Sequence, residues 1–283
     1  MTTPPGEPTR NEALRQLIRA ALEQLERGWT RLTTAQQTVL RALAGARRRG
    51  LRPGSVPLAV RDALKVFTTA TRRFSTDIGA LFERWTAVDL PWAYRLGAED
   101  ALRTAVLAPG RRRPSFDWTS THQDVLSVLT DACYSALMRR VTDTVRRAQA
   151  FARAVTSAAR STTSPDTEDL AAAHPLDTVT YEHGARHPAF SWARTALTAQ
   201  AVTVANTGAL TATTADLAAH WVHVTDGPEC GWTVHTDPDL AHNTFRSAEE
   251  AAAHPIAHPG CLRRFIPRPD LNEDPAIEEG QHS

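Results

Sequence analysis

The sequence has little of what marks exported, membrane-spanning or disulfide-rich proteins. Its 283 residues include three cysteines at widely separated positions, which excludes a disulfide framework as the basis of the fold. No apolar run approaches the ~18 residues that a membrane-spanning helix needs. The N-terminal residues also lack the charged and apolar regions of a signal peptide. We therefore expect a soluble protein that is not exported by the general route.

Lysine is almost absent, because Lys65 is the sole lysine among 32 Lys and Arg residues. The charge is also unevenly distributed along the chain. Residues 1–160 hold 26 basic and 14 acidic residues, a net charge of +12, whereas residues 161–283 hold 6 and 17, a net charge of −11. This asymmetry predicts a polyanionic or acidic partner, or attraction between the halves. A GC-rich coding sequence is the alternative source of the arginine excess.

Two N-terminal stretches show the heptad pattern of packed helices, with apolar residues at alternating intervals of four and three. The first, from about residue 9 to 49, has the seam Ile18, Leu22, Leu25, Trp29, Leu32, Gln36, Val39 and Leu43. The second has the seam Val60, Leu64, Phe67, Thr71, Phe74, Ile78, Leu81, Trp85 and Val88. A short Gly/Pro turn joins them, so we expect an antiparallel helical hairpin. The seams either pack on each other or offer surfaces to partner helices.

Further helices are predicted at about residues 91–107 and 120–160. A third runs from about residue 190 to 221, with a break at Asn206-Thr207-Gly208. The apolar stripe of the second contains Cys133, which we interpret as an ordinary buried thiol. The fold class predicted is mainly α, with a long antiparallel helical hairpin or bundle and a small C-terminal α+β module.

Changes in charge and composition predict four regions along the chain. Residues 1–160 form a basic helical region, and residues 161–189 form a linker and irregular segment. Residues 190–266 form the C-terminal module. Residues 267–283 form an acidic mobile tail.

The C-terminal module contains two pairs of potential metal ligands. Cys230 and His235 form a C-x4-H pair, and His258 and Cys261 form an H-x2-C pair. Two thiolates and two imidazoles predict a tetrahedral zinc site, whose four protein ligands leave no water to activate and thus indicate a structural ion. The alternatives are two unconnected buried thiols or a Cys230–Cys261 disulfide. The alternative ligands nearby are His223, His242 and His254.

No catalytic motif accompanies these residues. An open zinc site of the nucleobase-deaminase type needs H-x-E with P-C-x-x-C, whereas Glu182-His183 has the reverse order and no second close cysteine follows. Metalloprotease, P-loop and nucleophile-elbow motifs are also absent from the sequence. We therefore expect a protein that is not an enzyme.

Two arginine triplets are candidate nucleic-acid contacts. Arg47, Arg48 and Arg49 form one, and Arg111, Arg112 and Arg113 form the other. Both adjoin Gly/Pro turns, where guanidinium groups could reach the phosphates of a duplex. Ordinary solvated loops are the alternative.

The order of the C-terminal motifs resembles a known family. Asp226-Gly227-Pro228-Glu229-Cys230, the acidic turn Asp237-Pro238-Asp239, and His258-Pro259-Gly260-Cys261 resemble the C-terminal module of Mu F-like minor head proteins. These are the minor capsid, or head-morphogenesis, proteins of tailed double-stranded DNA phages, here most similar to forms from actinobacteriophages. The likeness covers about residues 190–270. Thr233 and Arg263 stand where the family pattern has cysteines.

The resemblance implies a virion component present in few copies, in the capsid interior or at the portal vertex. It would assemble in the host cytoplasm, with the portal or the major capsid protein as its partner. Double-stranded DNA is a further candidate partner during DNA packaging, and no membrane is implied. The alternative function is that of a zinc-stabilised nucleic-acid-binding regulatory protein, although the zinc-bearing half is the acidic one.

Overall fold

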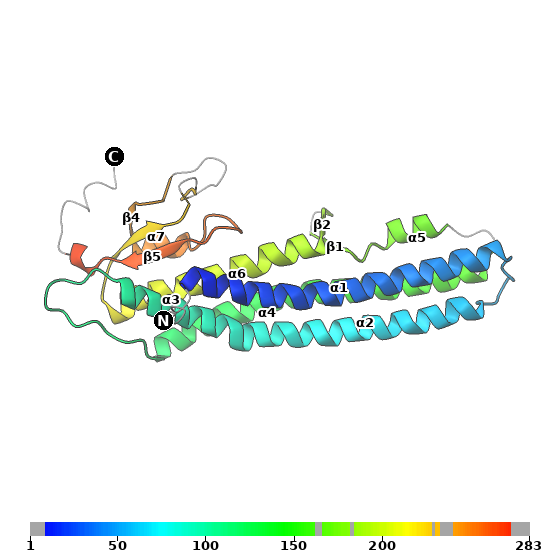
Figure 1. Ribbon diagram of the computed structural model, residues 1–283, viewed down its shortest axis with the longest axis horizontal. Coiled ribbons are helices and arrows are strands. Elements are labelled where there is room, and N and C mark those ends of the chain that lie inside the picture. The colour runs from blue at the N-terminus through cyan, green and yellow to red at the C-terminus, as the bar shows by residue number, and fades with distance from the viewer. Residues whose placement is uncertain (1–8, 162–165, 182–183, 228–229, 233–239, 273–283) are drawn as a thin grey trace, which may run out of the picture. The chain divides into compact units, whose positions relative to one another are not determined.

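The computed structural model describes residues 9–161, 166–181, 184–227, 230–232 and 240–272 (Figure 1). Long helices dominate it, and a small three-stranded sheet lies in its C-terminal part, which confirms the predicted fold class. Within the described residues, none of the helices combines the length and apolar character needed to cross a membrane.

Contacts along the chain define two compact units. Unit 1 is built from three segments, Met1–Arg19, Trp85–Cys133 and Thr195–Ser283. Unit 2 is built from two, Ala20–Arg84 and Tyr134–Arg194. The proposed metal ligands all fall in unit 1.

Unit 2 contains the predicted heptad helices. These are α1 (Arg10–Arg48) from residue 20 onward, α2 (Leu58–Arg84), and α4 (Ser120–Arg160) from residue 134 onward. Aromatic contacts join them, with ring centroids 4.7 Å apart for Trp29 and Phe74 and 5.1 Å apart for Phe67 and Phe151. The polar seam residue Gln36 is buried and donates from Nε2 to the carbonyl of His174 at 2.7 Å. The helical prediction for residues 9–49 and 120–160 is therefore confirmed.

The segment predicted as irregular contains three short elements. They are α5 (Thr167–Ala173), β1 (Thr178–Thr180) and β2 (Arg186–Pro188), and the two strands pair antiparallel. Arginines of α4 hold this segment through its backbone: Arg147 donates to the carbonyls of Pro175 and Thr178, and Arg140 donates to that of Thr180. Part of the predicted linker, residues 162–165, lies outside the described residues.

The helix predicted to begin at Pro91 is not preceded by a loop. A π-helical turn, η1 (Trp85–Asp89), leads from α2 directly into α3 (Leu90–Thr104). Pro91 follows the π turn directly, at the start of α3. A proline cannot donate to the carbonyl one turn earlier, so it is accommodated where the helical hydrogen-bond pattern changes from π to α.

The predicted break at Asn206-Thr207-Gly208 is wrong, because α6 (Ala189–Thr211) runs through it and ends in a second π turn, η2 (Ala212–Asp216). Asn206 is buried, and its side chain satisfies tertiary partners rather than ending the helix. Gly208 lies where α6 crosses α3. A Cβ at Gly208 would overlap the carbonyl oxygen of Tyr94, and a Cβ at Gly97 would overlap that of Ala205.

The sheet of unit 1 has the order β4-β3-β5, with both pairs antiparallel. Its strands are β3 (Trp221–Thr225), β4 (Phe245–Ser247) and β5 (Arg264–Pro267), and the short helices α7 (Ala248–Ala253) and η3 (Pro269–Leu271) follow β4 and β5. The core beneath it contains Leu210, Val222, Val224, Trp232, Ala241, Ala251 and Phe265. The loops that leave β3 and enter β5 carry Cys230, His258 and Cys261.

The close crossing of α3 and α6 gives a direct test of the fold of unit 1. We expect Gly97→Ala to lower the free energy of unfolding by about 3 kcal/mol or more, because the added methyl meets backbone that cannot rotate away. The control is Gly79→Ala in α2, where the nearest atom to the new methyl is Met138 Cε at 4.0 Å. That change should be neutral or stabilise by up to ~1 kcal/mol. Urea unfolding would measure both, and equal effects would contradict the crossing.

Candidate metal centre

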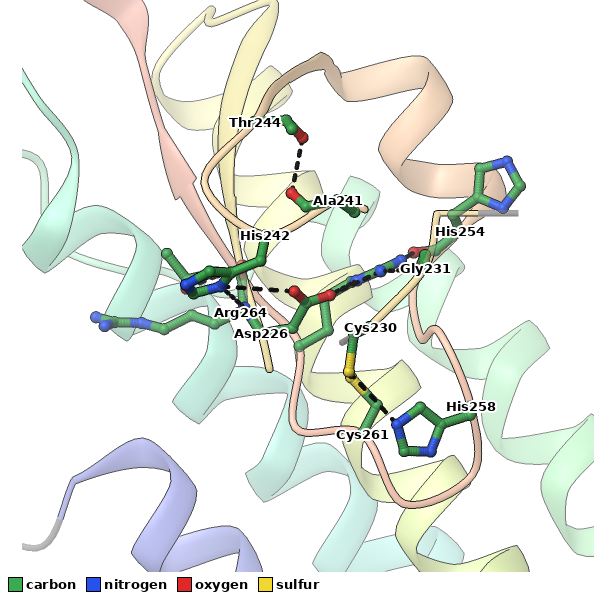
Figure 2. A network of polar contacts seen from close by, with 12 residues as sticks. Asp226, Cys230, Gly231, Ala241, His242, Thr244, His254, His258, Cys261 and Arg264 are labelled. Atoms are coloured by element: carbon green, nitrogen blue, oxygen red, sulfur yellow. Dashed lines mark hydrogen bonds and ion pairs between the residues drawn. The ribbon is translucent and has the colours of Figure 1, made fainter. Parts of the chain in front are cut away.

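Two loops of unit 1 bring Cys230, His258 and Cys261 together (Figure 2). Cys230 lies beyond the end of β3, and its N–H donates to the carbonyl of Gly227 at 2.9 Å. His258 and Cys261 lie between α7 and β5, where the Cys261 N–H donates to the His258 carbonyl at 2.9 Å. Each loop is thus a tight turn that presents its ligand side chains to the other.

The three potential ligand atoms form a compact cluster. Cys230 Sγ lies 3.6 Å from Cys261 Sγ and 3.4 Å from His258 Nε2, and all three atoms lie within 4.8 Å of one another. Both cysteines are buried, and His258 is half-buried. These residues are therefore close enough to bind one metal ion, as the sequence predicted for three of its four ligands.

Both cysteines of the cluster are free thiols. Their Sγ atoms lie 3.6 Å apart, much farther than the ~2.05 Å of a disulfide bond, so the structure has two thiols in contact rather than a disulfide. Burial, together with the neighbouring Cys230, raises the pKa of Cys261 to about 11, so without a cation this thiol stays protonated at neutral pH. A bound metal would displace that proton, because thiolate is the ligand form.

The imidazole of His258 is held on both sides. Its Nε2 faces Cys230 Sγ, and its Nδ1 accepts a hydrogen bond from the Gly260 N–H at 3.2 Å. In this arrangement the ring proton is on Nε2. Ligation through Nε2 would therefore require the proton to move to Nδ1, and the Gly260 contact would open.

The other histidines named as alternative ligands have different contacts. His223 packs against Phe245, and His254 packs against Trp232. His242 Nδ1 accepts the N–H of Asp226 at 3.0 Å. None of the three belongs to the ligand cluster found among the described residues. The fourth predicted ligand, His235, lies outside those residues.

A buried ion pair connects the segments on either side of the cluster. Arg263 and Asp226 have fully buried side chains, and Arg263 donates from Nε and Nη2 to Asp226 Oδ2 at 2.9 and 2.7 Å. The same guanidinium donates to the carbonyls of Gly231 at 2.6 Å and His254 at 2.9 Å. Arg263 therefore bonds both the chain around Cys230 and the turn that precedes His258.

Further contacts extend this Arg263 network into the helices of unit 1. The guanidinium lies 5.2 Å from the ring centroid of Trp232, a cation–π contact. The carbonyl of Arg263 accepts from Asn206 Nδ2 at 2.9 Å and from Arg10 Nη1 at 3.2 Å. Burial lowers the pKa of Arg10 to about 10. The sequence gives no local signal for this role, because Arg263 stands directly beside a second arginine, Arg264.

The two arginine triplets occupy different settings. Arg47 and Arg48 form the last turn of α1, and Arg49 follows it, so two of the three are helical rather than in a turn. Arg48 and Arg49 are exposed, as are Arg111 and Arg112 in the loop after α3.

Arg113 has a structural role that its neighbours in the triplet do not share. Its Nη1 donates to the carbonyl of Leu102 at 2.6 Å and also to that of Arg103, at the C-terminal end of α3. A guanidinium at this end satisfies carbonyls that have no helical partner. Arg113 is therefore a helix cap in this structure.

No protein-family model, curated protein or solved structure matches the chain. The chemistry of the centre therefore rests on its own residues: two thiols and an imidazole beside a fully buried ion pair.

The ligand cluster predicts metal-dependent stability. Purified, reduced protein should hold about one equivalent of metal, and chelation should lower its melting temperature, because binding energy at such a site contributes to folding. Cys261→Ser should lose most of the bound metal, whereas Cys133→Ser, at the third free cysteine, should retain it. Elemental analysis gives the readout. Metal-free protein, or equal retention by both variants, would disprove the site.

The buried pair of Arg263 and Asp226 predicts that removing one partner destabilises the protein more than removing both. Arg263→Met should lower the free energy of unfolding by roughly 3–5 kcal/mol, because it leaves the Asp226 carboxylate buried without its partner. The exposed pair of Arg31 and Asp77 is the control, and Arg31→Met should change stability by less than ~1 kcal/mol. Adding Asp226→Leu to Arg263→Met should recover part of the loss. Denaturant unfolding in the presence of chelator separates these effects from metal binding.

Proposed function

We propose that the protein is a minor capsid protein that acts in head morphogenesis of a tailed double-stranded DNA phage. In this role it is a non-enzymatic virion component, located in the capsid interior or at the portal vertex. The observation that supports the proposal is the convergence of the motif residues. Cys230, His258 and Cys261 gather at one point, and Asp226 joins the ion pair beside it, although 35 positions separate the first and last of the four.

We propose zinc as the metal and a structural role for it, with His235 as the fourth ligand. Tetrahedral zinc, with Zn–S of about 2.3 Å and Zn–N of about 2.0 Å, places two sulfurs about 3.8 Å apart and a sulfur and a nitrogen about 3.5 Å apart. The corresponding separations here are 3.6 and 3.4 Å. Small outward movements of the side chains would therefore accommodate the ion. Two sulfur ligands also favour zinc over magnesium or calcium.

The proposed partners are the portal or the major capsid protein, with duplex DNA as a second ligand. For DNA, the exposed groups Arg48, Arg49, Arg111 and Arg112 are the suitable contacts, because guanidinium groups on a surface can reach phosphates. Arg113 is less suitable, since its Nη1 already donates to two carbonyls at the end of α3. Binding through such groups would be independent of sequence and sensitive to salt.

Particle composition tests the proposed role. Purified particles of the phage that encodes the chain should contain it in few copies relative to the major capsid protein. Cys261→Ser should reduce incorporation, because an unfolded C-terminal module would no longer present its surface, whereas Cys133→Ser should be incorporated normally. Quantitative mass spectrometry of gradient-purified heads measures both. Absence of the unaltered protein from finished particles and from assembly intermediates would contradict the proposal.

A further inference from the structure

Unit 2 has an open groove between α1 and α2, with a volume of about 560 Å³. Residues of both helices line it, among them Gly28, Arg31, Ala35, Lys65, Ala70 and Arg73. We call this the α1–α2 groove. Its lining residues belong to the heptad hairpin, whereas the residues of the metal centre belong to unit 1.

Three of the residues that line the groove are small. Gly28, Ala35 and Ala70 contribute at most a methyl group each, and we refer to them as the floor of the groove. A Cβ at Gly28 would lie 2.7 Å from Ile78 Cδ1, so the side chain of Ile78 packs against the α1 backbone there. Val66, at its edge, is 59% exposed. A channel with a small apolar floor suits the side chains of a third helix, as in helix-in-groove recognition.

The charged residues that line the groove all carry one sign. Arg31, Lys65 and Arg73 are cationic, and no lining residue is acidic. Two of these cations do have exposed acidic neighbours, since Arg31 lies 3.1 Å from Asp77 and Lys65 lies 3.5 Å from Asp62. Surface pairs of this kind are weak, so both cations can exchange their partner for another carboxylate.

We propose that the α1–α2 groove binds an amphipathic helix of a partner protein, with small apolar residues facing the floor and acidic residues along both edges. Charge complementarity selects this occupant. A second copy of α1 or α2 would bring further arginines to a cationic rim. A DNA duplex presents phosphates and has no apolar face for the small residues of the floor. The proposal is independent of the proposed role in head morphogenesis.

A pair of synthetic helical peptides tests this surface on the full chain. Both have three heptads with alanine and leucine at positions a and d; one has glutamate at positions e and g, and the other has lysine there. Fluorescence anisotropy should show at least tenfold tighter binding of the acidic peptide, and added salt should weaken it. Equal affinity for the two peptides, or no binding of either, would overturn the proposal.

Substitutions in the groove assign the binding to its residues. The double variant Lys65→Glu/Arg73→Glu should bind the acidic peptide at least tenfold more weakly than the unaltered protein does. It should bind the basic peptide more tightly. Ala70→Trp should block both by filling the channel. The control Arg146→Glu/Arg153→Glu makes the same charge change at exposed positions of α4 in unit 2, outside the groove, and should bind like the unaltered protein. Circular dichroism confirms that each variant is folded.

Three results would refute the groove as a site for an acidic helix. The first is an equal loss of peptide binding in the groove and control variants. The second is that neither peptide binds, whereas duplex DNA binds and its binding depends on Lys65 and Arg73. That result would show that these cations contact a nucleic acid. The third is self-association that Ala70→Trp abolishes, which would show that a second copy occupies the groove.

Discussion

The structure of the metal centre depends on one fully buried guanidinium. Burying a charge is unfavourable unless it is paired and hydrogen-bonded, so Arg263 restricts which arrangements its neighbours can adopt. Asp226 supplies the opposite charge, and the carbonyls of Gly231 and His254 accept two further N–H groups of Arg263. These partners precede or follow the three metal-ligand residues in the chain. The loops are therefore held together by hydrogen bonds before any ion binds.

The ion pair and the metal cluster act on the same loops through different chemistry. Arg263 joins the segments around Cys230 and His258 through Asp226 and through the carbonyls of Gly231 and His254. The potential metal ligands lie on these same segments, with Cys230 Sγ 3.6 Å from Cys261 Sγ and 3.4 Å from His258 Nε2. The hydrogen bonds of one buried side chain therefore hold the ligand-bearing loops close together.

The parts of the fold predicted from sequence are those that local pattern determines. The heptad seams and the helix at 120–160 follow from side-chain periodicity, which needs no knowledge of distant contacts. The helix break predicted at Asn206 and Gly208 was wrong. The local sequence favours a turn there, but tertiary contacts stabilise a continuous helix. Asn206 has buried partners from three other segments, and Gly208 permits the crossing with α3.

The potential metal ligands could be predicted from the sequence, but the residues that hold their loops in place could not. Cysteine and histidine at turn-compatible spacing indicate a metal ligand set whatever the fold. The role of Arg263 depends instead on Asp226, which is 37 positions away, and on Arg10, which is 253 positions away. No periodicity or spacing rule connects residues so distant. Their association became visible only when the burial and hydrogen bonds of the side chains were known.

Several arginines of this chain hold its segments together, so the positive charge of residues 1–160 is not all available to a partner. Arg10, Arg113, Arg140, Arg147 and Arg263 all donate to backbone carbonyls of distant or helix-end segments. A guanidinium can do this because its five N–H groups point in fixed, divergent directions, whereas a lysine ammonium is a single point of contact. The net charge of +12 on residues 1–160 therefore overstates the cationic surface available to a polyanion. Arginine therefore has a structural role at these five positions, whatever codon usage contributed to the composition elsewhere.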